Sequence, residues 1–250
     1  MSQPGANVGY LSLNVEKAPF NKVEVRQAIA HALNRENYMK VIYQGTATVA
    51  KSPIPPTVWG SAKDTQDYDY NPEKAKELLK KAGYPNGFET ELWTLPVSRP
   101  YNPNGKKMGE LMQADLAKVG IKVKLVSYEW GTYLEKTRKG EHAMAQLGWT
   151  TDNGDPDNFL GTLLTCGAVN SGNMSRWCDK SYDQLIVKAK AVTDMKARTQ
   201  QYLKAQDMFK KQVPWVTLAH ATVYRALRSN VDGYKISPLG TEDFYPVDLK

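Results

Sequence analysis

Hydrophobic and polar positions along the 250-residue chain repeat with two periods, one of about two residues and one of about 3.6 residues. Alternation with the shorter period predicts β-strands, whereas apolar residues that recur every three or four positions predict amphipathic helices. The predicted strands cover residues 8–14, 88–95, 121–126, 143–147, 215–218 and 223–227. The predicted helices cover residues 23–33, 35–43, 72–82, 108–119, 128–139, 180–192 and 195–211, and a further helix begins near residue 156.

The middle of the chain is the most regular part of this pattern. From Glu73 to Leu147 the order is helix, strand, helix, strand, helix, strand, with connections of the length common in α/β proteins. That order favours a layered α/β domain with a largely parallel sheet. The segment from Thr46 to Asp69 is expected to be a loop, because three prolines and a glycine interrupt any regular element there.

Charge and hydropathy argue against several classes of function. The chain has 33 Lys and Arg against 26 Asp and Glu, a formal net charge of +7. These cations are scattered, so the concentrated stripe that binds nucleic acid is not expected. No run approaches the roughly 18 apolar residues of a transmembrane helix. The first residues, MSQPGANVGY, lack the basic and apolar regions of a secretory leader.

The common signatures of catalytic and metal sites are also missing from the sequence. It contains no GxSxG, HExxH, P-loop or GxGxxG motif, so an enzyme is not expected. The three histidines are far apart and two cysteines alone cannot form a zinc site, so no metal or cofactor is expected. Cys166 and Cys178 have two interpretations: a disulfide worth about 3 kcal/mol, typical of an oxidising compartment, or two unpaired thiols of a cytosolic protein.

The stretch from His142 to Leu164 carries the strongest candidate for binding chemistry. Its pattern predicts a short strand, a Gly-Trp pair where the strand ends, a polar loop with three acidic residues, and then a helix. Asp155 suits the N-cap of that helix and Pro156 its first position. Asp152 has no such role. It follows Trp149 beyond the carboxyl end of a strand, where open α/β sheets place ligands, and a carboxylate beside an indole suits an ammonium group.

A second loop offers the opposite charge. Residues 96–104, the arginine loop, contain Arg99 and Tyr101, and residues 148–156, the aspartate loop, contain Asp152. If both loops face one crevice, the site has a cation at one end, an anion at the other and aromatic walls, which suits a small zwitterion. The alternative for Arg99 is a surface ion pair near the start of a helix.

Several stretches also resemble a known protein family. The resemblance is to cluster C extracellular solute-binding proteins, the peptide and nickel receptors of ABC transporters, and it is carried by GYLSLNVEKAPFNKVEVRQAIAHALN, YNPEKAKELLKKAGYPNGF, LPVSRPYNPN, VSYEWGTYL and GWTTDNGDPDNFLGTLLTC. It implies an α/β lobe of the type II periplasmic-binding-protein kind, with a mixed sheet flanked by helices. It further implies a periplasmic location, no cofactor, an ABC permease as partner and a dipeptide or short peptide as ligand. Haem, glutathione or longer peptides are alternative ligands.

The resemblance also implies roles for single residues. In peptide receptors of the family, an Asp in the GWTxDNGDPD loop holds the peptide amino terminus and an Arg in the VxRPYNPN loop holds the carboxylate. The matching residues in this chain are Asp152 and Arg99. Further residues expected to line the site are Tyr101, Trp149 and Thr150. The cysteines match a family disulfide, which implies a bond between Cys166 and Cys178.

The chain departs from the family in length, because family members are about twice as long. Residues 8–222 are expected to form the ligand-closing lobe, and residues 223–250 a returning segment of a first lobe whose main sequence this chain lacks. We expect this chain alone to bind peptides weakly, because half of a bound peptide would face water, which screens both charges. A fragment without a ligand of its own is the alternative.

Overall fold

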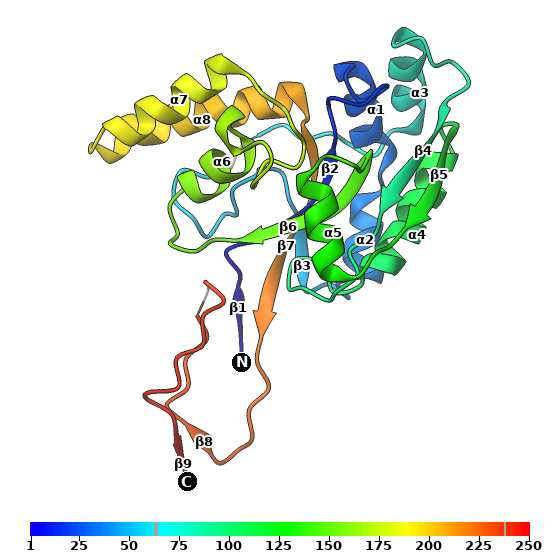
Figure 1. The fold of residues 1–250 in the computed structure, drawn as a ribbon. Helices are drawn as coiled ribbons and strands as arrows, with labels where there is room; N and C mark the ends of the chain where they lie inside the picture. Colours follow the sequence, from blue (N-terminus) through cyan, green and yellow to red (C-terminus); the bar gives the residue numbers. More distant parts are fainter. Residues whose placement is uncertain (63–64, 238) are drawn as a thin grey trace.

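The computed structural model describes residues 1–62, 65–237 and 239–250, and a seven-stranded sheet runs through its centre (Figure 1). The strand order is β1, β7, β2, β6, β4, β5, and β3 also pairs with β7. The strands are β1 (Ser2–Pro4), β2 (Asn7–Leu13), β3 (Ala47–Val49), β4 (Phe88–Trp93), β5 (Ile121–Val126), β6 (Met144–Thr150) and β7 (Trp215–Tyr224). Residues 63 and 64 of the expected loop and residue 238 of the expected returning segment lie outside the described residues.

The sheet is mixed, as the family resemblance implies, and the parallel arrangement predicted from residues 73–147 holds for the three strands of that segment but not for the whole sheet. β4 runs parallel to β5 and to β6. β2 is antiparallel to both β6 and β7, and β1 and β3 are antiparallel to β7. Parallel neighbours require a crossover connection, usually a helix, and helices connect β4 to β5 and β5 to β6. The strands from the two ends of the chain join this unit edge to edge in the opposite direction.

Helices cover both faces of the sheet (Figure 1). One face packs against α1 (Val23–Ala32), α2 (Arg35–Val41), α3 (Pro72–Lys81) and α4 (Gly105–Ala117). The other face packs against α5 (Trp130–Arg138), α6 (Asp157–Leu164), α7 (Lys180–Ala191) and α8 (Met195–Gln212). The central strand β2 serves both cores, because Leu11 and Leu13 enter the first and Val8 and Tyr10 the second. A strand buried on both faces makes the middle of the sheet the most rigid support for a site at its edge.

Local sequence signals explain most element boundaries. The Asn71 side chain accepts a hydrogen bond from the Lys74 backbone N–H at the start of α3, which confirms the predicted cap. Asn104 caps α4 in the same way, so this helix begins three residues before the predicted one. The two strands predicted at 215–218 and 223–227 are one strand, β7, because pairing with three neighbouring strands carries it through the small and polar residues between them.

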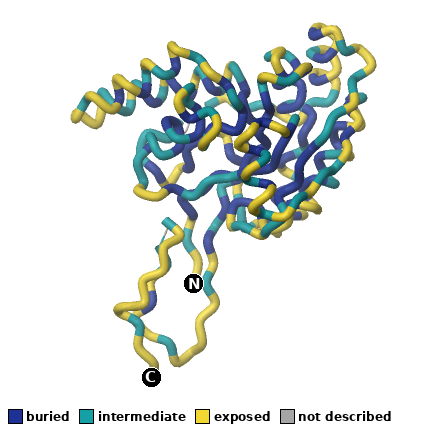
Figure 2. The backbone as a smooth tube through the Cα atoms, viewed as in Figure 1, coloured by how far each residue is buried: buried dark blue, intermediate teal, exposed yellow. Residues whose placement is uncertain are grey.

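The C-terminal tail differs from the rest of the molecule. After β7 the chain leaves the body, forms the short strands β8 (Val231–Asp232) and β9 (Asp248–Leu249), and ends away from the sheet (Figure 1). Figure 2 shows that the tail is largely exposed, whereas the body has a buried interior. Phe244, Tyr245 and Leu249 expose 66%, 99% and 68% of their surface. None of the described helices has the length and apolar character needed to cross a membrane.

Candidate ligand-binding site

The arginine loop and the aspartate loop leave the same edge of the sheet. β4 and β6 are parallel neighbours, with Leu92 opposite Met144 and Trp93 opposite Ala145. The arginine loop follows β4. The aspartate loop, as defined from the sequence, begins within the end of β6 and continues beyond it. Because parallel strands end on one side, both loops lie over the carboxyl edge of the sheet, where ligand sites of α/β proteins occur.

β6 is longer than predicted, which changes the setting of two candidate residues. The sequence places the end of the strand at the Gly-Trp pair, but Trp149 and Thr150 continue it. They pair with Val8 and Asn7 of β2 respectively, so a partner strand is available where the local pattern ended. Trp149 and Thr150 are half-buried and are held by the sheet rather than by a loop.

A direct contact joins the two loops. The ring of Tyr101 lies against Gly148 so closely that a Cβ atom there would be 2.1 Å from the ring. The Tyr101 carbonyl accepts a hydrogen bond from the Tyr43 hydroxyl at 2.6 Å and lies over Gly9, where an added Cβ would be 2.4 Å from its oxygen. Burial raises the pKa of the Tyr101 hydroxyl, and the nearby Arg99 guanidinium partly opposes that rise. Tyr101 is therefore neutral at physiological pH and holds the arginine loop against β6.

A buried glutamine on β6 supports the backbone of the arginine loop. Gln146 is fully buried, and its Oε1 accepts hydrogen bonds from the Leu95 backbone N–H at 3.1 Å and from the Asn102 amide at 3.2 Å. Asn102 and Arg99 then exchange two backbone hydrogen bonds, at 2.9 and 3.0 Å. This chain of contacts orients the turn that carries Arg99. Sequence analysis missed Gln146, although a glutamine within an apolar strand was a visible signal for a buried polar role.

The Arg99 side chain has little support beyond this turn. It is half-buried, its guanidinium carbon lies 5.0 Å from the centroid of the Trp130 ring, and it donates a long hydrogen bond of 3.3 Å to the Ser98 carbonyl. Within the described part of the chain, no carboxylate oxygen lies within 4.0 Å of its nitrogens. Among the described residues, therefore, no carboxylate neutralises the charge of Arg99, and none forms the surface ion pair considered as its alternative role.

Asp152 is exposed and has an amide as its main partner. Its Oδ2 accepts a hydrogen bond from Asn158 Nδ2 at 2.9 Å, and its backbone N–H donates to Asn158 Oδ1 at 2.9 Å. Asn158 Oδ1 also accepts from Trp149 Nε1 at 2.8 Å. Sequence analysis missed Asn158, because an asparagine in the first turn of a helix is ordinary.

The other two acids of the aspartate loop have internal partners. Asp155 accepts from the Asp157 backbone N–H at 2.9 Å at the start of α6 and pairs with Arg198 at 3.0 Å. Asp157 pairs with Lys190 at 2.9 Å. Asp155 caps the helix start as the sequence predicts, although the regular helix begins at Asp157 rather than at Pro156. Among the three acids, Asp152 is the one without a cation within 4.0 Å in the described chain.

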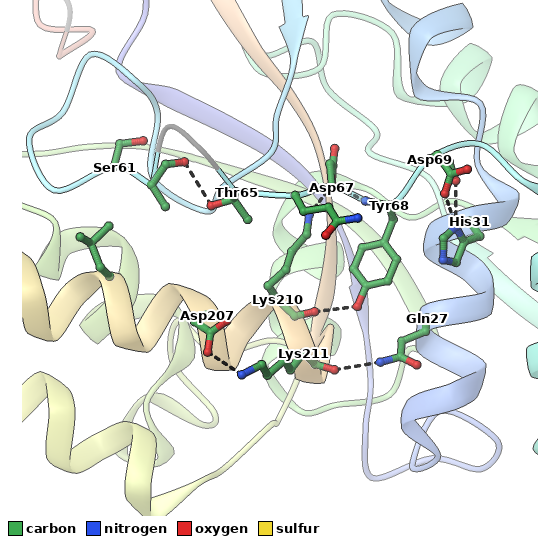
Figure 3. A pocket seen from close by; sticks show the side chains of 13 residues that line it. Gln27, His31, Ser61, Thr65, Asp67, Tyr68, Asp69, Asp207, Lys210 and Lys211 are labelled. Atoms are coloured by element: carbon green, nitrogen blue, oxygen red, sulfur yellow. Dashed lines mark hydrogen bonds and ion pairs between the residues drawn. The ribbon is translucent and has the colours of Figure 1, made fainter.

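A large cavity lies elsewhere, between α1, α8 and the segment that precedes α3 (Figure 3). It measures about 890 Å³ and contains none of the predicted ligand-binding residues. The carboxylates around it are paired within the chain: Asp67 with Arg35 at 2.9 Å, Asp69 with His31 at 3.0 Å and Asp207 with Lys211 at 2.7 Å. A smaller hollow of about 330 Å³, lined by Ser98, Asn104 and Ser127 among others, adjoins the arginine loop. Arg99, which is half-buried, and Asp152, which is exposed, thus lie on an open edge of the sheet rather than in a closed pocket.

The structure also bears on the cysteines and on metals. Cys166 and Cys178 form a disulfide, with their Cα atoms 4.5 Å apart, just beyond α6. In the residues that the structure describes, no group of three or more His, Cys, Asp or Glu side chains is arranged to hold a metal ion.

Comparisons with known proteins agree with the sequence resemblance. Residues 1–171 match the family model described as "Bacterial extracellular solute-binding proteins, family 5 Middle". The chain is 49% identical to the dipeptide-binding protein of Escherichia coli (strain K12), over 100% of this chain and 47% of that protein. It is 45% identical to heme-binding protein A of Haemophilus influenzae, over 100% of this chain and 46% of that protein.

A solved structure gives the same picture. The ABC transporter-associated periplasmic binding protein DppA of Helicobacter pylori, in complex with the peptide STSA, matches with a TM-score of 0.93 and 43% identity, over 100% of this chain and 48% of that one. The expected fold class, an α/β lobe of the type II periplasmic-binding-protein kind with a mixed sheet, is confirmed. The matched relatives are solute-binding proteins, not enzymes, and the chain spans about half of their length.

Proposed function

The chain belongs to family 5 of the bacterial extracellular solute-binding proteins, and from that membership we propose that it forms one lobe of a receptor that captures dipeptides or short peptides for an ABC transporter. Asp152 binds the peptide ammonium group and Arg99 binds its carboxylate. Tyr101, Trp149 and Thr150 line the space between. This assignment extends to the chain what the names of its relatives state about them.

One observation carries the proposal: two opposite charges lie on loops over the same sheet edge, and no described residue of opposite charge pairs with either of them. A hydrogen bond to a charged group contributes about 1.5–3 kcal/mol, so each peptide terminus can add a large part of the affinity. A ligand that lacks one charge leaves Arg99 or Asp152 desolvated and unpaired, which costs binding energy. The Tyr101 contact with Gly148 supports the idea that the two loops act as one site.

We further propose that a second lobe covers the ligand. Residues 8–222 form the lobe described above, and residues 223–250 pack with the other lobe, which is supported by the exposed Phe244, Tyr245 and Leu249. The half-length match to the relatives agrees with this division. The open setting of Arg99 and Asp152 agrees as well, because water screens charges that only one lobe contacts. A periplasmic location suits the Cys166–Cys178 disulfide, since such bonds persist in oxidising compartments.

The experiment that tests the proposal is calorimetric titration of this chain, alone and mixed with the amino-terminal half of a family 5 receptor, with a dipeptide. We expect sub-micromolar affinity only in the mixture. N-acetylation of the peptide should weaken binding as much as Asp152→Asn does, about 10-fold or more, and should cost little further on that variant. C-terminal amidation should do the same with Arg99→Gln. Glu36→Gln, which removes an exposed carboxylate on α2, is the control. Equal affinity of Asp152→Asn and the unchanged chain would refute the assignment.

Haem is a second candidate ligand, because heme-binding protein A matches the whole chain at 45% identity. An apolar macrocycle does not need Arg99 and Asp152 as a pair. Asp152→Asn should therefore weaken dipeptide binding about 10-fold or more and spare haem binding, measured by the haem absorption spectrum. If both ligands are lost equally, the distinction between the two sites fails.

A further inference from the structure

We propose that Asn158 is the positioning residue of the ammonium subsite, because one amide group orients both the Asp152 carboxylate and the Trp149 indole. This inference rests on the proposed function, in which Asp152 binds the peptide amino terminus. Asn158 itself does not contact the ligand and acts through its two neighbours.

The hydrogen bonds use both ends of the Asn158 amide. Oδ1 accepts from Trp149 Nε1 at 2.8 Å and from the Asp152 backbone N–H at 2.9 Å, which uses both of its lone pairs. Nδ2 donates to Asp152 Oδ2 at 2.9 Å. A carboxylate at this position would lack the donor, and an apolar residue would lack both functions. An asparagine therefore fits all three contacts at once.

The position of Asn158 is itself well determined. It lies in the first turn of α6, where its backbone N–H donates to the Asp155 carbonyl at 3.0 Å. Asp155 is paired with Arg198, which lies on α8 and stacks on Trp59 with 4.9 Å between the guanidinium carbon and the ring centroid. Contacts that run from α8 through α6 to the end of β6 thus fix the position of the Asn158 amide.

This arrangement prepares Asp152 for a cation. Asn158 occupies Oδ2, whereas Oδ1 has no hydrogen-bond partner among the residues that the structure describes. An exposed aspartate side chain rotates among several rotamers unless a neighbour holds it, and holding it before binding removes that entropy cost from the binding step. The same amide keeps the Trp149 ring beside the carboxylate, where its face can contact an ammonium group.

The test begins with this chain and needs no ligand. In ¹H–¹⁵N spectra, Asn158→Ala should shift the Trp149 indole N–H resonance upfield and increase hydrogen exchange at the Asp152 amide at least about 10-fold. The Leu147 amide should keep its protection, because it lies within the sheet. Asn153→Ala is the matched control, since among the described residues the side chain of this asparagine hydrogen-bonds the Asp155 backbone N–H and neither Trp149 nor Asp152. Unchanged Trp149 and Asp152 signals in Asn158→Ala would overturn the positioning role.

Binding to the two-lobed receptor then tests the consequence. Asn158→Ala should weaken binding of a free dipeptide about 10-fold and binding of its N-acetylated form by less than about twofold. Asn158→Asp, which keeps the size and the acceptor, should preserve the Trp149 resonance but weaken dipeptide binding, because its carboxylate cannot donate to Asp152 Oδ2 and repels it, so that Asp152 is no longer held in place. Equal losses for both peptides would contradict a role specific to the ammonium end. A dipeptide that binds Asp152→Asn normally would instead refute the proposed function, while the spectra still decide the role of Asn158.

Discussion

The two loops of the candidate site differ in how each holds its charged group. In the arginine loop the backbone is well supported, through Gln146 and the paired turn at Asn102. Among the described residues, the Arg99 guanidinium itself has the Trp130 ring face, the nearby Tyr101 hydroxyl and one long hydrogen bond, and no carboxylate pairs with it. In the aspartate loop the charged group itself is held, because Asn158 binds both the backbone and the carboxylate of Asp152.

If Asp152 and Arg99 bind the two ends of a peptide as proposed, this difference predicts that the two ends are held in different ways. A carboxylate held by an amide presents its free oxygen in one direction, which suits an ammonium group at a constant place. A long guanidinium with loose support can follow a carboxylate that moves with the length of the ligand. We therefore expect the aspartate end to set the register of a peptide and the arginine end to tolerate variation in its length.

The largest expected effect concerns the disulfide, a covalent link that lies near the aspartate loop and not near the arginine loop. The Cys166–Cys178 disulfide spans 12 residues just beyond α6, and replacing both cysteines with serine should lower the free energy of unfolding by about 3 kcal/mol. Urea denaturation measures this loss. Amide exchange should then increase in α6 and at Asp152 more than in α4, which follows the arginine loop. An equal increase in both helices would show that the two sides are not separately braced.

The next effect tests the contact that the two loops share. In Gly148→Ala the new Cβ would be 2.1 Å from the Tyr101 ring. The backbone of Tyr101 resists a shift away from it, because its carbonyl accepts a hydrogen bond from the Tyr43 hydroxyl. Such overpacking should cost about 2 kcal/mol of unfolding free energy. Gly167→Ala is the control, because nothing lies within 4 Å of its added Cβ and its φ is not in the left-handed region. If Gly148→Ala changes stability no more than this control, the loops do not depend on their contact.

Acidic pH should destabilise the start of β6, the strand that carries the aspartate loop and contacts the arginine loop. His142 is fully buried just before β6, and burial lowers its pKa from 6.5 to about 4, since the charged ring loses its water. Between pH 6.5 and pH 4 the unfolded chain binds more protons at this histidine than the folded chain does. The free energy of unfolding is therefore not reduced by His142 above pH 6.5, and it falls as the pH decreases toward 4.

The size of this effect is measurable. From pH 7 to pH 5.5 the free energy of unfolding should fall by about 1 kcal/mol because of His142, and urea denaturation at each pH measures this loss. Burial also lowers the pKa of His220 from 6.5 to about 4, so His142→Phe should remove about half of the slope, whatever the stability of the variant at pH 7. A slope that His142→Phe leaves unchanged would assign the pH dependence to His220 or to other groups.

A feature of the fold or of the candidate site could be predicted from the sequence where the residues that determine it lie close to it in the chain. The Asn71 cap and the Gly83 stop are adjacent to the helix they delimit, and α3 formed as expected. Asp152 was selected because no local role explained it, and Arg99 because it offers the opposite charge on a second loop. Among the described residues, neither side chain has an oppositely charged partner within 4.0 Å. Whether they bind a peptide stays a prediction.

Features that depend on distant segments were not predictable in this way. The antiparallel insertion of β2 between β6 and β7 is set by tertiary packing, and it also extends β6 through Trp149 and Thr150. Asn158 carries no unusual sequence signal, because its function arises only when α6, β6 and the intervening loop are brought together. Residues that position other residues are thus harder to find than residues that carry the charge.

The smallest expected effect tests the looser half of the comparison. Trp130 stacks on Tyr133, with 5.9 Å between ring centroids, and its face lies under Arg99. A cation–π contact at an exposed site contributes about 0.5–1 kcal/mol, so Trp130→Ala should weaken dipeptide binding by the two-lobed receptor about 2–5-fold. A C-amidated dipeptide should show almost no change, and Trp130→Phe, which keeps a ring face, should recover part of the loss. If Trp130→Ala costs as much as Asn158→Ala, then Arg99 is held as firmly as Asp152, and tolerance of ligand length would need another source.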